Sequence, residues 1–98
     1  MTINVYCDAD PDNSYDYIIT LGESEDLWDL PSQIYKLEQW LETNIGKLNK
    51  GSYVADIGFT VREDATGGGA VLNRKMILML HQIGMEIYFS EYNFIDEV

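Results

Sequence analysis

Residues 52–63, SYVADIGFTVRE, alternate strictly between apolar and polar side chains. The apolar set comprises Tyr53, Ala55, Ile57, Phe59 and Val61, and the opposite set comprises Asp56, Gly58, Thr60 and Arg62. A period of two predicts a β-strand that buries one face and leaves the other in water. The chain must therefore build a sheet with one wet face, which rules out a sheet covered on both sides.

Three further segments have the same period. Residues 2–7, TINVYC, and residues 15–22, YDYIITLG, predict two strands joined by the turn-rich loop DADPDNS. Residues 85–94, MEIYFSEYNF, predict a last strand. The expected inward positions are Ile3, Val5 and Cys7, then Tyr15, Tyr17, Ile19 and Leu21, and finally Met85, Ile87 and Phe89.

Two segments have helical spacing. From Pro31 to about Lys50, apolar residues recur three or four positions apart, which predicts an amphipathic helix with a proline in its first turn. Residues 72–84, LNRKMILMLHQIG, predict a second helix that ends at Gly84 in a left-handed cap. The apolar faces consist of Ile34, Leu37, Trp40, Leu41, Ile45 and Leu48, and of Leu72, Met76, Met79, Leu80 and Ile83.

The order β-β-α-β-α-β predicts an α+β two-layer sandwich: a four-stranded, mainly antiparallel sheet with two helices on one face. Its 98 residues, of which 46% are hydrophobic, suit a single domain over residues 1–98. An exposed edge strand could pair with another chain, so a homodimer is one possible assembly.

The charge is strongly negative, with 17 acidic and 6 basic side chains and a net charge of −11. Such a chain repels nucleic acid and anionic membranes, and it attracts cationic partners. The segment MTINVYCDAD has no basic region and no long apolar run, so we expect a cytoplasmic protein without a membrane span. Cys7, the one cysteine, excludes an internal disulfide.

The acidic side chains concentrate between Asp8 and Asp29, where the chain has eight carboxylates and neither Lys nor Arg. Aromatic residues are interleaved with them, as in interfaces where buried anchors are surrounded by orienting charges. The alternative is an acidic surface that only keeps the protein soluble. The predicted partner-binding residues are Asp8, Asp10, Asp12, Asp16, Tyr17, Glu23, Glu25, Asp26, Trp28 and Asp29.

The stretch EDATGGGAVLNRK, residues 63–75, invites comparison with phosphate-binding loops. It lacks the Lys and Ser or Thr of a Walker loop, and we expect no parallel β-α-β unit that would complete a dinucleotide site. A plain strand-to-helix connection is the simpler interpretation. The alternative is a small-molecule site formed by Gly67, Gly68, Gly69 and Arg74, with Arg62 and Lys75 adding positive charge.

No other motif predicts a reaction, a metal or a cofactor. The acidic loop DADPDN has Asn13 and Ile19 where an EF-hand needs glycine and glutamate. His81 is the sole histidine, and no motif places a nucleophile beside it. We therefore expect neither an enzyme nor a metal site.

The second half of the chain has a succession of segments that resembles a known family. The helix IYKLEQWLETNIGKL, the strand YVADIGFTV, the triplet GGG, the helix LNRKMILMLHQIGM and the strand EIYFSEY follow one another. Residues 30–94 thereby resemble small bacterial proteins of the domain of unknown function 4279 family. The resemblance implies an α+β sandwich with the glycines in the strand-to-helix turn, and it implies no reaction. The short, acidic N-terminus departs from that pattern.

These observations favour an inhibitory binding protein, such as an immunity protein or an antitoxin-like partner that covers the basic active site of a nuclease toxin. A phage-encoded inhibitor of a nucleic-acid-binding defence protein would have the same composition. A ligand-binding or regulatory module that uses the glycine turn is the alternative from a different class.

Overall fold

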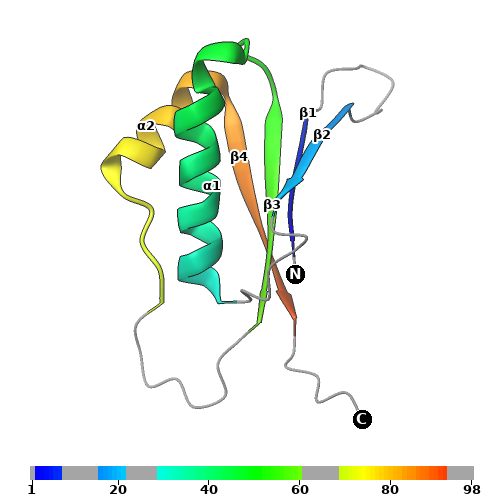
Figure 1. The fold of residues 1–98 in the computed structure, drawn as a ribbon, viewed down its shortest axis with the longest axis vertical. Helices are drawn as coiled ribbons and strands as arrows, with labels where there is room; N and C mark the ends of the chain where they lie inside the picture. The colour runs from blue at the N-terminus through cyan, green and yellow to red at the C-terminus, as the bar shows by residue number, and fades with distance from the viewer. Residues whose placement is uncertain (1, 8–15, 22–28, 61–68, 93–98) are drawn as a thin grey trace.

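A computed structural model describes residues 2–7, 16–21, 29–60 and 69–92 of the chain, and its elements follow in the predicted order (Figure 1). The strands are β1 (Ile3–Cys7), β2 (Asp16–Leu21), β3 (Tyr53–Thr60) and β4 (Met85–Tyr92). The helices are α1 (Leu30–Asn44) and α2 (Arg74–Ile83), and a 3-10 turn, η1 (Ile45–Lys47), follows α1. The predicted α+β class is confirmed. Neither α-helix of the described segments has the length and apolar character that a membrane span requires.

The four strands form one mixed sheet in the order β2-β1-β3-β4. β1 pairs antiparallel with β2 and with β3, whereas β3 and β4 are parallel. The parallel pair arises because α2 carries the chain back to the end of the sheet where β3 begins. The expectation that no parallel β-α-β unit exists was therefore wrong, since β3, α2 and β4 form one.

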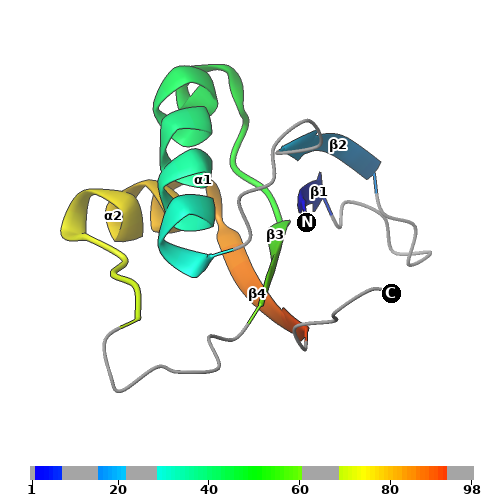
Figure 2. The ribbon, with the colours of Figure 1, turned by 60° about the horizontal axis from the view of Figure 1, so that its bottom comes forward.

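Helices α1 and α2 lie on the same side of the sheet in both views (Figure 1 and Figure 2). The core fills the space between the helices and the alternate residues of the strands. Its members are Ile3, Val5, Ile34, Leu37, Leu41, Tyr53, Ala55, Ile57, Met76, Met79, Leu80, Ile83 and Met85. The inward positions predicted for Ile3, Val5, Ala55 and Ile57 are confirmed, because these residues are fully buried, but Val54 and Gly58 of β3 are buried as well.

Helix α1 begins where the sequence predicts and ends earlier. The Asp29 carboxylate accepts a hydrogen bond from the Ser32 N–H at 2.9 Å, and Pro31 lies in the first turn. The α-helix ends at Asn44 instead of near Lys50 and tightens into η1. The Asn44 side chain donates to the Trp40 carbonyl oxygen, and Gly46 follows, which disfavours further α-helix.

Helix α2 ends at Gly84, as predicted, with φ at +80°. The Gly84 N–H donates to the carbonyl oxygens of Leu80 and His81, and β4 begins at the next residue. A Cβ built on Gly84 would lie 2.1 Å from the Gly51 carbonyl oxygen. Glycine is therefore required at this corner both for its backbone conformation and for the close approach of Gly51.

The strands at the two edges depart from strict alternation. In β2, Ile19 pairs with Val5 but Tyr17 pairs with Tyr6, so Ile18 has no partner in the register. Such a bulge interrupts the two-residue repeat of a strand. The prediction that Tyr17 shares a face with Ile19 and Leu21 lies outside the described side chains. In β4, Met85 is buried as predicted, but Phe89 is 50% exposed, because the ten-residue α2 covers only the start of the strand.

Candidate functional site

Charge is sorted between the two layers of the fold. The four strands, all within the described segments, contain Asp16, Asp56, Glu86 and Glu91 and neither Lys nor Arg. The helices and η1 contain Lys36, Lys47, Arg74 and Lys75 beside only two carboxylates, Glu38 and Glu42. The charged residues of the strands are thus all acidic, whereas those of the helices and η1 have a slight positive excess.

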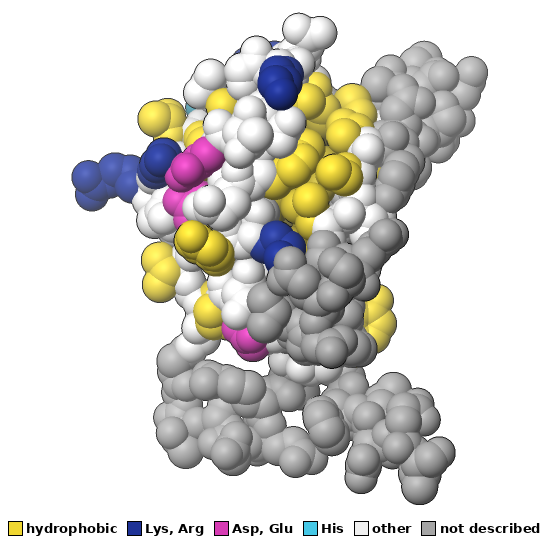
Figure 3. All heavy atoms as spheres, viewed as in Figure 1, with side chains coloured by type: hydrophobic (Ala, Val, Ile, Leu, Met, Phe, Trp, Pro, Cys, Tyr) yellow, Lys and Arg dark blue, Asp and Glu magenta, His cyan; other side chains and the backbone are white. Residues whose placement is uncertain are grey.

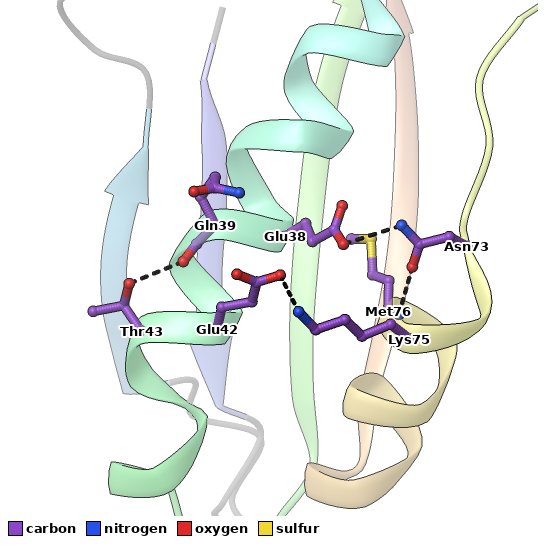
Figure 4. Close-up of polar contacts among 7 residues, drawn as sticks. All are labelled: Glu38, Gln39, Glu42, Thr43, Asn73, Lys75 and Met76. Carbon is purple, nitrogen blue, oxygen red and sulfur yellow. Dashed lines mark hydrogen bonds and ion pairs between the residues drawn. The ribbon is translucent and has the colours of Figure 1, made fainter.

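The two carboxylates of the helix layer are engaged within that layer (Figure 4). Lys75 Nζ lies 2.7 Å from Glu42 Oε1, and Asn73 Nδ2 donates to Glu38 Oε2 at 3.0 Å. The hydrogen bond to Glu42, together with the Glu42 charge, raises the pKa of Lys75. In Figure 3, dark blue and magenta side chains accordingly lie side by side over the helices. These contacts link the start of α2 to α1, and the ion pair with Lys75 compensates the charge of Glu42.

The sheet face turned away from the helices, called here the open face, is formed by the even-numbered residues of β1, β3 and β4. Its members are Asn4, Tyr6, Val54, Asp56, Gly58, Thr60, Glu86, Tyr88, Ser90 and Tyr92. Tyr88 and Tyr92 are 48% and 50% exposed, and Glu86 is also exposed. Two half-exposed tyrosines beside carboxylates have the composition of a protein-binding surface.

Asp56 has a fixed position at the centre of this face. Its Oδ1 accepts a hydrogen bond from the Ser90 hydroxyl of the neighbouring strand, and Tyr88 is its partner in the β3–β4 register. Val54 is almost fully buried, although it lies on the same face, between Tyr6 and Glu86 in the ladder. The wet face predicted from the alternation is therefore wet chiefly along β4.

Most predicted partner-binding residues lie outside the described segments: Asp8, Asp10, Asp12, Glu23, Glu25, Asp26 and Trp28. Asp16 and Tyr17 belong to β2, at one edge of the acidic sheet. Asp29 is the N-cap of α1, so its carboxylate has a structural role in addition to any role in binding. The interface in this segment stays a prediction.

The glycine turn is described only in part. Gly67 and Gly68 lie outside the described residues, and Gly69 is exposed with φ at +138°. Arg74 is the exposed first residue of α2, and the Asn73 carboxamide oxygen already accepts the Met76 N–H at 2.8 Å. Residues 61–73 separate β3 from α2, a longer connection than the tight turn of a dinucleotide site. A ligand at this turn stays a prediction.

The described residues form no recognisable catalytic or metal-binding arrangement. They contain no group of three or more His, Cys, Asp or Glu side chains that could hold a metal ion. His81 is exposed in the last turn of α2, and Cys7 is a half-buried free thiol. Burial, with a smaller contribution from Cys7, raises the pKa of Tyr53, whose hydroxyl donates to the Asn49 carbonyl oxygen at 2.6 Å. Tyr53 is thus a core residue with a satisfied hydroxyl group.

No family model matches this chain, and neither a curated protein nor a solved structure matches it. The resemblance to the domain of unknown function 4279 family accordingly stays a prediction. The functional interpretation depends on the surface just described.

Binding by the open face along β4 is not among the sequence predictions, because the acids before Asp29 dominate the charge distribution. Two signals could have found it. The even-numbered positions of MEIYFSEY are Glu86, Tyr88, Ser90 and Tyr92, opposite the apolar set of the same strand. The predicted strands also lack any Lys or Arg apart from Arg62, which places the basic residues on the other layer.

Proposed function

We propose that this protein is an acidic inhibitory binding protein, of the immunity or antitoxin type, that neutralises a basic partner such as a nuclease toxin by direct contact. It acts by binding instead of catalysis, in the cytoplasm of a bacterium. The observation that carries the proposal is the sorting of charge: the strands have carboxylates and exposed tyrosines and no cation, and the helices and η1 have more cations than carboxylates.

A nuclease binds a polyanion, so the surface around its active site is basic. A sheet face that carries Asp56 and Glu86 is complementary in charge to such a surface, and Tyr88 and Tyr92 add contact area at a low cost in side-chain entropy. The net charge of −11 accelerates the encounter with a basic partner at low salt. The acidic segment from Asp8 to Asp29 follows β1 in the sequence and includes β2, and its eight carboxylates add to the negative charge that would attract a basic partner.

The test is capture of the partner with matched charge variants. The purified protein serves as bait in a lysate of its host at low and moderate salt, and the retained protein is identified, purified and assayed for nuclease activity with and without the bait. Glu86→Gln on the open face and Glu42→Gln on the helix layer change the net charge equally. We expect the Glu86 variant to retain less partner and to inhibit less, and the Glu42 variant to match the original protein.

The predicted contacts before α1 are tested in the same assay. Asp26→Asn and Asp29→Asn each remove a charge, and asparagine at position 29 still caps α1. Weaker retention of the partner by both variants would extend the binding surface to this segment. Equal loss in all charge variants, including Glu42→Gln, would reduce the proposal to non-specific electrostatics. An Arg74→Ala variant that lost more activity than Asp26→Asn would favour the ligand-binding alternative.

A further inference from the structure

The two edges of the sheet are built differently. β2 has six residues and a register shift against β1, and such bulges discourage pairing with another chain. β4 has eight residues in unbroken register with β3, and it contains neither proline nor lysine. Its side chains at the middle of the strand, Tyr88 on the open face and Phe89 on the helix side, are both about half exposed. Among the residues that the structure describes, the long, regular edge of β4 has no further strand beside it.

The backbone of β4 has groups that β3 does not use. The ladder starts with the Tyr53 N–H, which donates to the Gly84 carbonyl oxygen at 3.1 Å. A parallel ladder uses every second residue of a strand, so the even-numbered residues of β4 bond to β3. The N–H and C=O groups of Met85, Ile87, Phe89 and Glu91 consequently point to the free edge, where an extended chain can complete the sheet.

The side chains along β4 determine which kind of extended peptide segment can pair with its free edge. Glu86 lies on the open face and Glu91 on the helix side, and both are exposed. Between them, Tyr88 and Phe89 offer one aromatic ring on each face, and Phe89 packs edge-on against Phe59 with ring centroids 6.3 Å apart. A second copy of this chain would bring another net charge of −11 to the same edge, whereas a basic segment would be attracted to it.

We propose that β4 binds an extended basic segment of the partner by strand addition, in the antiparallel direction, with basic residues opposite Glu91 and Glu86 and apolar residues opposite Phe89 and Tyr88. The segment has the pattern basic-x-apolar-apolar-x-basic. This inference rests on the proposed function, since both require a basic partner, and it adds the mode of binding.

The probe is a capped hexapeptide, Arg-Thr-Val-Val-Thr-Arg, titrated into the whole protein at low salt while the backbone amides are followed by NMR and hydrogen exchange. We expect the amides of Ile87 and Phe89 to gain protection and those of β2 to stay unchanged. N-methylation of the first Val blocks an N–H that faces β4 and weakens binding about tenfold or more. N-methylation of the second Val, whose N–H faces away, leaves the affinity unchanged.

Control peptides and outcomes that would overturn the inference are built into the same titration. A peptide with Glu in place of both Arg residues must not bind. Equal binding of the two N-methylated peptides, or protection of β2 instead of β4, would refute strand addition at this edge. Sedimentation that showed a dimer of the protein alone, abolished by Phe89→Pro and kept by Phe89→Ala, would assign the edge to a second copy.

Binding experiments with the intact partner protein, in place of the peptide, distinguish failure of this inference from failure of the proposed function. Phe89→Pro removes both the aromatic ring and the backbone N–H at the free edge. Phe89→Ala removes the ring and keeps the N–H. Loss of partner binding in the proline variant alone, with both variants folded by circular dichroism, supports strand addition. If both variants bind the partner normally while Glu86→Gln does not, the edge inference fails and the proposed function stands; if no basic protein binds at all, the proposed function fails.

Discussion

The two faces of one sheet differ in their exposure to solvent, although the same strands supply both. Odd-numbered residues of β1 and β3, such as Val5 and Ile57, are fully excluded from water beneath the helices. Even-numbered residues one position away include Asp56, and Tyr88 and Tyr92 on β4 are about half exposed. The difference teaches that the strand period separates the residues that stabilise the core from those on the face proposed to bind a partner, so each set can be changed while the other is left intact.

The largest expected loss of stability comes from a substitution on the buried face. Ile57→Ala removes a fully buried side chain from the centre of β3, and the cavity that it leaves should lower the free energy of unfolding by about 3 to 4 kcal/mol. Urea unfolding followed by circular dichroism measures this loss. Thr60→Ala, on the other face of the same strand, should change stability by less than about 0.5 kcal/mol. Similar losses in both variants would mean that the two faces are not separate.

The second effect concerns the corner where the helix layer joins β4. Gly84→Ala forces a side chain into a left-handed conformation and against the Gly51 carbonyl oxygen, 2.1 Å from the new Cβ. The backbone conformation alone should cost about 2 kcal/mol, and the contact adds to it. The control is Gly46→Ala, where a Cβ meets nothing within 4 Å. Thermal unfolding of the two variants should differ by several degrees, and equal midpoints would contradict this account.

The sequence predicted the buried face well and the edges poorly, for physical reasons that these residues illustrate. Periodicity is local, so it placed Ile57 in the core and Gly84 at a helix end without knowledge of the rest of the chain. The parallel pairing of β3 with β4 depends on the path of α2, which no strand pattern encodes. The bulge at Ile18 shifts the register between β1 and β2 by one residue, a change that a period of two in the sequence does not reveal.

The candidate site was harder to predict because the number of charges in a sequence segment does not determine where charges meet on the folded surface. The acids before Asp29 dominate the composition, yet the described acidic surface is completed by Asp56, Glu86 and the tyrosines of β4, which are scattered in the sequence. These residues meet only when β3 and β4 pair. Composition therefore predicts a basic partner, whereas the surface proposed to bind it can be located only once the pairing of the strands is known.

A third, smaller effect separates structural carboxylates from those available for recognition. Asp29→Ala removes the cap of α1 and should lower the free energy of unfolding by about 1 kcal/mol. Asp29→Asn keeps an acceptor for the Ser32 N–H and should be close to neutral for stability. Chemical unfolding of the pair measures the difference. An equal loss in both variants would show that the charge of Asp29, and not the cap, stabilises the helix.

Substitutions of exposed tyrosines should have the smallest effect on stability, and they test most directly whether the open face binds the proposed partner. Tyr88→Ala, on the open face, and Tyr35→Ala, on α1, each remove an exposed tyrosine, since these side chains are 48% and 63% exposed. Each should change the free energy of unfolding by less than about 0.5 kcal/mol. Only the Tyr88 variant should weaken binding of the captured basic partner, by about tenfold or more, if the ring is an anchor of the interface. Calorimetric titration of the partner with both variants measures this difference. A larger loss of affinity for Tyr35→Ala would move the binding surface to the helix layer, because two tyrosines of similar exposure then differ only in the face on which they lie.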